Sequence, residues 1–304
     1  FFLLRLAMGI VTGFIPTSMA FISKHTPNEV AGKTLGTLQM GSVGGTLFGP
    51  VLGGMMADAF GFKYTFIITA TLITIAAVII IIGIHEPTII RKVKSSVYAR
   101  KNVVWAIFHH RLLLNVMLVT TLIQIGNFSI QPLLSLYVSE LSHTQEVAML
   151  AGITFSAAGL GNLLFARFWG KLSDHHGYEK VLAYLLIAAV VFIIPQAFVT
   201  ELWQLIGLRF LFGIVSGGLI PITTALIRRE APIEVQGEIM GYNQSFRFLG
   251  NILGPVLGGF VASLGGIHSV FYTTGLLFLI AFVVIYFLRK LPVQYMDELL
   301  KNHA

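Results

Sequence analysis

Three arginines lie inside long apolar stretches of the sequence, where a charge is costly and usually has a function. They are Arg5, Arg209 and Arg247. A charge at the centre of a membrane helix costs about 2.5–3.5 kcal/mol on insertion scales. Arg5 and Arg209 lie near the ends of their stretches, where a long side chain can snorkel towards water. Arg247 lies deeper, roughly 13–14 Å beyond Glu238 at 1.5 Å per residue. Since no carboxylate of the sequence lies at that depth, its partner is a segment beyond this sequence, an anionic substrate or water.

A line of amides precedes a proline in another apolar stretch. Gln124, Asn127 and Gln131 are three and four residues apart and therefore share one face of a helix, with Phe128 beside them. This face either bonds to a neighbouring helix or offers hydrogen bonds and an aromatic contact to a ligand. Asn243 and Gln244, within a turn of Arg247, are expected to form the opposing wall. The candidate substrate cavity thus comprises Gln124, Asn127, Phe128, Gln131, Asn243, Gln244 and Arg247.

The composition shows what must position these side chains. Of 304 residues, 56% are apolar and 11% are charged, whereas soluble domains carry about 25% charged residues. A membrane-spanning helix needs about 20 mostly apolar residues. We therefore predict an all-α integral membrane protein with spans near 1–22, 34–57, 64–84, 112–138, 147–169, 180–199, 203–227, 238–262 and 269–289.

Basic residues predict the orientation of these spans. If the spans alternate, most of the 20 Lys and Arg fall on one side of the membrane, which the positive-inside rule makes cytoplasmic. The segment 85–111 and the tail are therefore expected in the cytoplasm of a multi-pass plasma-membrane protein. The segment 85–111 is also somewhat amphipathic, so we expect it to lie on the anionic inner leaflet. The basic pI of about 9.7 follows from this topology, and nucleic-acid binding is not expected.

An internal repeat divides the sequence into two halves. Arg5-x-x-x-Gly9 recurs as Arg209-x-x-x-Gly213, and further matches continue downstream in register. Parallel repeats of this kind are typical of transporters built from two bundles. We expect three helices of a first bundle in 1–84, a linker in 85–111, a six-helix bundle in 112–289 and a tail in 290–304. Because the first half begins at the counterpart of a fourth helix, three further helices are expected before Phe1.

The longest repeated run is rich in glycine. The first copy holds Gly45, Gly49, Pro50, Gly53 and Gly54, and the second holds Gly250, Gly254, Pro255, Gly258 and Gly259. Glycines four residues apart share one helix face and allow a second helix to approach closely. The run is read either as tight packing alone or as a kinked seal that closes one face of a cavity.

These residues resemble the major facilitator superfamily. The glycine-proline run is similar to the antiporter signature of its fifth helix, and Leu4-Arg5-x-x-x-Gly9 resembles the motif of its fourth. Gly170, Asp174 and Gly177 resemble the gating loop between helices eight and nine, although His175, Tyr178 and Glu179 stand where basic residues are usual. The resemblance, strongest to Gram-positive drug:proton antiporters of twelve spans, implies a two-bundle fold and makes Arg5 the proton-coupling candidate.

We therefore expect a secondary transporter that exports small amphipathic molecules in exchange for protons by alternating access. A carrier of one metabolite or nutrient, or a membrane sensor or structural subunit without transport, is the alternative. No enzyme motif, cofactor or metal site is expected, because His109-His110 and His175-His176 lack helical metal spacing and are interpreted as solvated. The expected partners are the substrate, protons and the bilayer, and the chain is expected to be monomeric. The carboxylate that couples export to protons is expected in the segment before Phe1.

Overall fold

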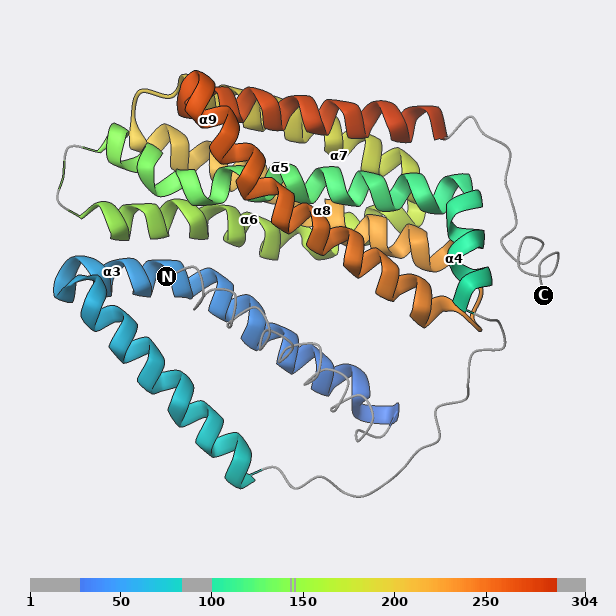
Figure 1. The fold of residues 1–304 in the computed structure, drawn as a ribbon, viewed down its shortest axis with the longest axis horizontal. Helices are drawn as coiled ribbons and strands as arrows, with labels where there is room; N and C mark the ends of the chain where they lie inside the picture. The colour runs from blue at the N-terminus through green and yellow to red at the C-terminus, as the bar shows by residue number, and fades with distance from the viewer. Residues whose placement is uncertain (1–27, 84–99, 143, 145, 289–304) are drawn as a thin grey trace. The chain divides into compact units, whose positions relative to one another are not determined.

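The computed structural model describes residues 28–83, 100–142, 144 and 146–288. Throughout these residues the regular elements are helices (Figure 1). Six of them are long and apolar enough to cross a membrane. The helices are α3 (Asn28–Gly83), α4 (Arg100–His109), α5 (Arg111–Leu141), α6 (Val147–His176), α7 (Tyr178–Ile193), the 3-10 helix η1 (Ile194–Phe198), α8 (Leu202–Glu230) and α9 (Gln236–Leu288).

The two longest helices are each two arms joined at a glycine. Gly61 in α3 and Gly266 in α9 have φ angles of 79° and 76°, a region that glycine adopts readily. A straight α9 of 53 residues would be roughly 80 Å long, far more than the ~30 Å hydrocarbon core of a membrane. The arms therefore match separate predicted spans, 34–57 with 64–84 and 238–262 with 269–289. The predicted span 1–22 lies outside the described residues.

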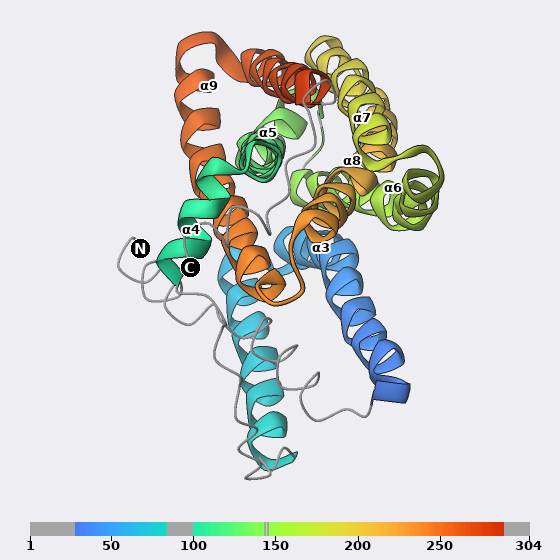
Figure 2. The same cartoon turned by 90° about the vertical axis from the view of Figure 1, so that its right-hand side faces the viewer.

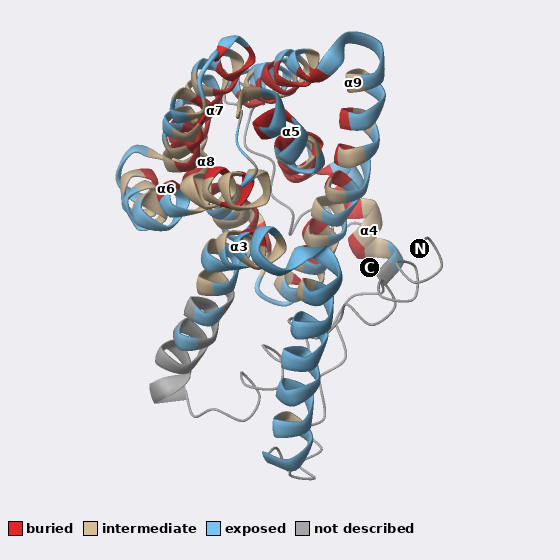
Figure 3. Cartoon of the chain, turned by 90° about the vertical axis from the view of Figure 1, so that its left-hand side faces the viewer, coloured by how far each residue is buried: buried red, intermediate tan, exposed pale blue. Residues whose placement is uncertain are grey.

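The chain divides into two compact units, Phe1–Gly49 and Pro50–Ala304, which are described separately. In the second unit, α5 packs along α9 and α6 packs along α8 (Figure 2). Leu113, Leu186, Leu205 and Phe278 are completely or almost completely buried in its core. By contrast, the arm of α3 after Gly61 is mostly exposed (Figure 3), and many of its exposed side chains are large and apolar. Apolar exposure of this kind is expected where a helix faces lipid.

The helices of this second unit have two distinct ends. The breaks at Gly61 and Gly266 and the α5–α6 and η1–α8 connections lie at one end, which we call the glycine-break end (Figure 1, left). The opposite end, where α4 meets α5, α6 meets α7 and α8 meets α9, is called the basic end. A cavity between the helices would open at one of these two ends.

The short helix α4 departs from the expectation for the linker. We expected its apolar residues to rest on the membrane surface, but Val103, Ala106 and Ile107 are buried in the protein core, and only Phe108 of its apolar face is strongly exposed. The helix packs against the start of α5, which covers this face instead of lipid. Residues 84–99 of the linker lie outside the described part.

His110 is a second departure from expectation. It was interpreted as solvated, but it is 1% exposed, and its Nδ1 accepts a hydrogen bond from the backbone N–H of Leu113 at 3.2 Å. Its side chain therefore caps the N-terminus of α5, where the first N–H groups of a helix have no partner within the helix.

Candidate functional site

The second glycine run is a packing surface between α9 and α5. A Cβ atom added at Gly250, Gly254 or Gly258 would collide with atoms of Gln124, Phe128 or Ser129 on α5. Such close approach of two backbones is the usual role of small residues in membrane helices. Gly259 points elsewhere, since nothing in the described structure lies within 4 Å of a Cβ built there. Pro255 is half-buried on the same arm of α9.

The amides of α5 have different environments, although they share one helix. Gln124 is buried and its Nε2 donates to Oδ1 of Asn251 on α9 at 2.8 Å. Asn127 is half-buried, and Gln131 is exposed. At Gln124, α5 and α9 are therefore in direct contact. Asn251, which sequence reasoning missed, is the partner.

Arg247 and Asn243 keep unused hydrogen-bonding capacity. Arg247 is half-buried on α9, and its Nη1 donates to Oε1 of the half-buried Gln244 at 3.0 Å. The Nε of Arg247 and the Oδ1 of Asn243 are buried, and neither has a hydrogen-bond partner among the described residues. An unmade bond of a buried polar group is costly, so these atoms are candidates for contact with a ligand or water.

Arg209 is the most deeply buried cation of the described structure. It is 6% exposed, and its Nε and Nη2 lack hydrogen-bond partners within the described residues. Its guanidinium lies 5.9 Å from the centre of the Phe271 ring, a cation–π distance. Gly213, one turn further along α8, packs against Ala158 of α6. Its repeat counterpart, Arg5, lies outside the described residues.

The first glycine run contacts α6 through a different face from the one expected. We predicted a stripe of Gly45, Gly49 and Gly53, but no described atom lies within 4 Å of a Cβ built at Gly53, and Gly45 and Gly49 belong to the other unit. Gly54 instead lies against the backbone carbonyl of Ala148.

The contact continues along both helices. A Cβ at Gly152 of α6 would collide with the backbone carbonyl of Pro50 on α3. Four residues past Gly54, Asp58 accepts backbone N–H bonds from Ala148 at 3.3 Å and Met149 at 2.7 Å. Pro50, Gly54 and Asp58 therefore form one face of α3 that meets the start of α6 near the glycine-break end.

The predicted gating loop is mostly helical. The helix α6 continues to His176, so Gly170 and Asp174 lie in its last turns, and Gly177 with a φ of 92° is the whole connection to α7. Asp174 accepts a hydrogen bond of 2.7 Å from the hydroxyl of Tyr178. Tyr178 also lies 5.5 Å from the guanidinium of Arg229.

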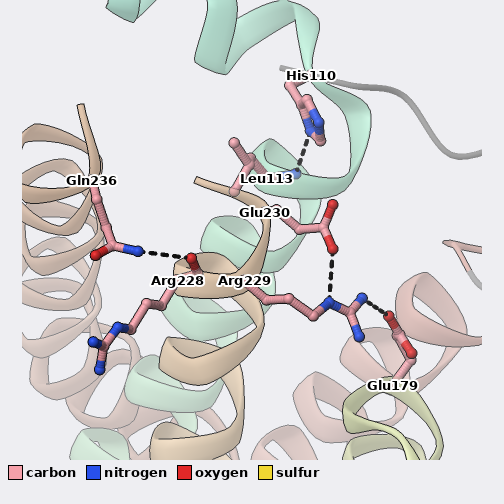
Figure 4. A network of polar contacts seen from close by, with 7 residues as sticks. All are labelled: His110, Leu113, Glu179, Arg228, Arg229, Glu230 and Gln236. Atoms are coloured by element: carbon pink, nitrogen blue, oxygen red, sulfur yellow. Dashed lines mark hydrogen bonds and ion pairs between the residues drawn. The ribbon is translucent and has the colours of Figure 1, made fainter. Parts of the chain in front are cut away.

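Glu179, at which this motif departs from the family pattern, forms an ion pair. Its carboxylate accepts a 2.7 Å bond from Arg229, which also donates to Glu230 at 2.9 Å (Figure 4). The Arg229–Glu179 pair joins α8 to α7 at the basic end. The residue that stands where the family pattern is usually basic is thus an acceptor for Arg229.

Comparison with known proteins identifies the family of this arrangement. The family model of the Major Facilitator Superfamily matches residues 1–160 and 116–301. The chain is 54% identical over 291 residues to the uncharacterized MFS-type transporter YuxJ of Bacillus subtilis (strain 168), covering 95% of this chain and 74% of that protein.

More distant relatives carry a functional name. The multidrug resistance protein MdtG of Salmonella dublin is 38% identical over 275 residues, covering 90% of this chain and 68% of that protein. MdtG of Dickeya zeae (strain Ech586) is 39% identical, covering 90% and 67%. Among solved structures, a bacterial homologue of the human lysosomal transporter Spinster, in an inward-facing and unoccupied conformation, superposes with a TM-score of 0.66 at 11% identity, covering 94% of this chain and 75% of that one. This last likeness concerns the fold alone.

Proposed function

The chain belongs to the major facilitator superfamily, and from that premise we propose that it exports small amphipathic molecules in exchange for protons. Its relatives at 38% and 39% identity are named multidrug resistance proteins, which supports export of drug-like compounds. The glycine-proline run that resembles the antiporter signature supports exchange rather than import.

The contact between α3 and α6 carries this proposal. In the proposed organisation, α3 belongs to the first bundle and α6 to the second, so their packing at Gly54 and Gly152 is a contact between bundles. It lies near the glycine-break end. Alternating access requires such a seal to form on one side of the membrane and to separate when the site opens there. If the glycine-break end faces outwards, this contact favours a state in which the site is open to the cytoplasm.

The proposed orientation follows the basic residues. Arg228, Arg229 and Lys171 lie towards the basic end, which we place in the cytoplasm with the 85–111 linker and the tail. Residues 1–84 belong to the first bundle and residues 112–289 form the second. The protein works as a monomer in the plasma membrane.

Arg247 favours a second candidate, a carrier for a specific anionic metabolite. The Nε of its guanidinium is buried without a hydrogen-bond partner in the described helices, and Asn243 and Gln244 lie within one turn. A carboxylate or phosphonate group on the substrate would accept a hydrogen bond from the Nε–H of Arg247. A pump for hydrophobic cations gains nothing from a cation in this position.

The test is transport by the complete protein in inverted membrane vesicles. With the vesicle interior acidified, we expect accumulation of fluorescent amphipathic dyes that an uncoupler abolishes. Gly54→Leu should reduce accumulation strongly because leucine cannot fit against Ala148, whereas Gly53→Leu, which meets no described atom, should retain it.

Dyes of both charges separate the two candidates. Accumulation of cationic and neutral dyes supports multidrug export. Uptake restricted to anionic compounds, with loss in Arg247→Gln, supports the metabolite carrier. Absence of proton-dependent flux for every probe, in correctly folded protein, contradicts both.

A further inference from the structure

The first turn of α6 has no cap of its own. Its N-cap residue is Glu146, which makes no side-chain cap hydrogen bond. Glutamate is not among the residues that favour this position, which are mainly Ser, Thr, Asp and Asn. The first bond within the helix that involves this turn runs from Leu150 N–H to the carbonyl of Glu146. The N–H groups of Ala148 and Met149 precede it and have no partner inside the helix.

A carboxylate from another helix takes that place. Asp58 of α3 accepts from Ala148 through Oδ1 at 3.3 Å and from Met149 through Oδ2 at 2.7 Å. An ionised carboxylate is well suited to this position, because it accepts through both oxygens and lies at the positive end of the helix dipole. In the described structure Asp58 forms no ion pair with a cation, so these two amides are its polar partners there.

The packing around Asp58 makes the contact depend on the spacing of the two helices. Gly54 lies one turn before Asp58, and its lack of a side chain lets α3 approach the backbone of Ala148. Gly152 does the same for Pro50 one turn further along α6. Separation of the two helices at this end breaks both bonds together, because the backbone N–H groups of Ala148 and Met149 both donate to the one carboxylate of Asp58.

We propose that Asp58 is a latch between the two bundles, a capping residue supplied across the interface that holds the glycine-break end closed. The inference rests on the proposed function, since only a protein with alternating access needs this interface to open. In the closed state the carboxylate caps α6. In the open state the first turn of α6 is uncapped and both groups are free to meet water, so Asp58 is a positioning residue that sets the balance between the states.

The balance between the closed and the open state can be measured with spin labels attached to cysteines. These 304 residues contain no cysteine, so within them a spin label attaches only to an introduced cysteine. Phe60 on α3 and Thr144 before α6 are both exposed and lie at the same end. Distances between labels at Phe60→Cys and Thr144→Cys, measured by pulsed electron spin resonance in lipid nanodiscs, report whether this end is open.

We expect Asp58→Asn to raise the ratio of long to short label distances roughly ten-fold, since an amide has one acceptor oxygen and no charge. Asp58→Glu should keep part of the closed population. Met149→Pro should act like Asp58→Asn, because proline removes the shorter donor yet is tolerated in the first turn of a helix. Combining the two changes should add little to either one.

Glu146→Gln is the matched control. It removes one negative charge from the same exposed end of α6 without touching either bond, so the distances should not change. Unchanged distances in Asp58→Asn, or an equal shift in Glu146→Gln, would overturn the latch. If Met149→Pro does not fold, the comparison of Asp58→Asn with Glu146→Gln still decides.

The dye assay separates this inference from the proposed function. If the parent protein transports dye but Asp58→Asn does not change the label distances, the latch proposal is wrong and the proposed export is supported. If Asp58→Asn changes the label distances but the protein transports none of the probes, the latch proposal is supported and the proposed export is wrong.

Discussion

The side-chain amide of Gln124 donates a hydrogen bond of 2.8 Å to Oδ1 of Asn251, joining α5 to α9. Gln124 is 6% exposed, and Gly250, the residue before Asn251, lies against its Cβ. The bond therefore lies within a tightly packed helix pair. Of the seven cavity candidates, Gln124 is consequently the one whose amide donor already has a partner on the neighbouring helix.

Removing this bond should change stability more than substrate affinity. We expect Gln124→Leu to lower the unfolding free energy by about 0.6 kcal/mol, with 1.7 kcal/mol as the upper bound, the range measured for interhelical hydrogen bonds in a membrane protein. Thermal unfolding in detergent measures the change. Adding Asn251→Leu should cost less than the sum of the single changes, and strict additivity would show that the two residues do not act as a pair.

The glycines of α9 should differ sharply in their tolerance of side chains. Gly258→Leu places a side chain against the carbonyl of Ser129, whereas Gly259→Leu meets no described atom within 4 Å. We expect overpacking to cost about 1–3 kcal/mol or more in Gly258→Leu and little in Gly259→Leu. Yields of monodisperse protein and unfolding temperatures measure both. Equal tolerance at the two positions would contradict the packing of α9 on α5.

Replacing Arg209 should affect the stability and the transport activity of the protein differently. Its guanidinium is buried, with Nε and Nη2 unpartnered in the described residues. Replacing even a buried ion pair by apolar residues of similar volume is often neutral or stabilising by about 1–4 kcal/mol, because burying a charge is costly. We therefore expect Arg209→Met to unfold at the same or a higher temperature while dye flux falls. A loss of stability with normal flux would make Arg209 a structural residue.

The ion pair at the basic end should contribute little and should depend on salt. The side chain of Arg229 is 46% exposed and that of Glu179 is 24% exposed, and exposed pairs contribute about 0.2–1 kcal/mol. Glu179→Gln should lower the unfolding temperature slightly in low salt and hardly at all at about 1 M salt, where the screening length is ~3 Å. A large effect that persists in high salt would indicate a role beyond this pair.

The sequence predicted the apolar spans that lie within the described residues and their order, including the separation of 34–57 from 64–84 and of 238–262 from 269–289. Hydrophobic length is a local property, so about 20 apolar residues predict a crossing wherever they occur. The repeat predicted glycine-mediated packing, and in α9 the expected stripe of Gly250, Gly254 and Gly258 does face a helix. The family resemblance was likewise visible in short motifs.

Only the tertiary structure decided which side chains meet. It paired Gln124 with Asn251, buried His110 as a cap, turned Gly54 rather than Gly53 towards α6 and placed Asp58 on the first turn of α6. The physical reason is that lipid tails are as apolar as leucine, so hydrophobicity does not set the rotation of a membrane helix about its axis. That rotation is set by small-residue packing and hydrogen bonds with a partner far away in the sequence, and the partner is known only when the helices are assembled.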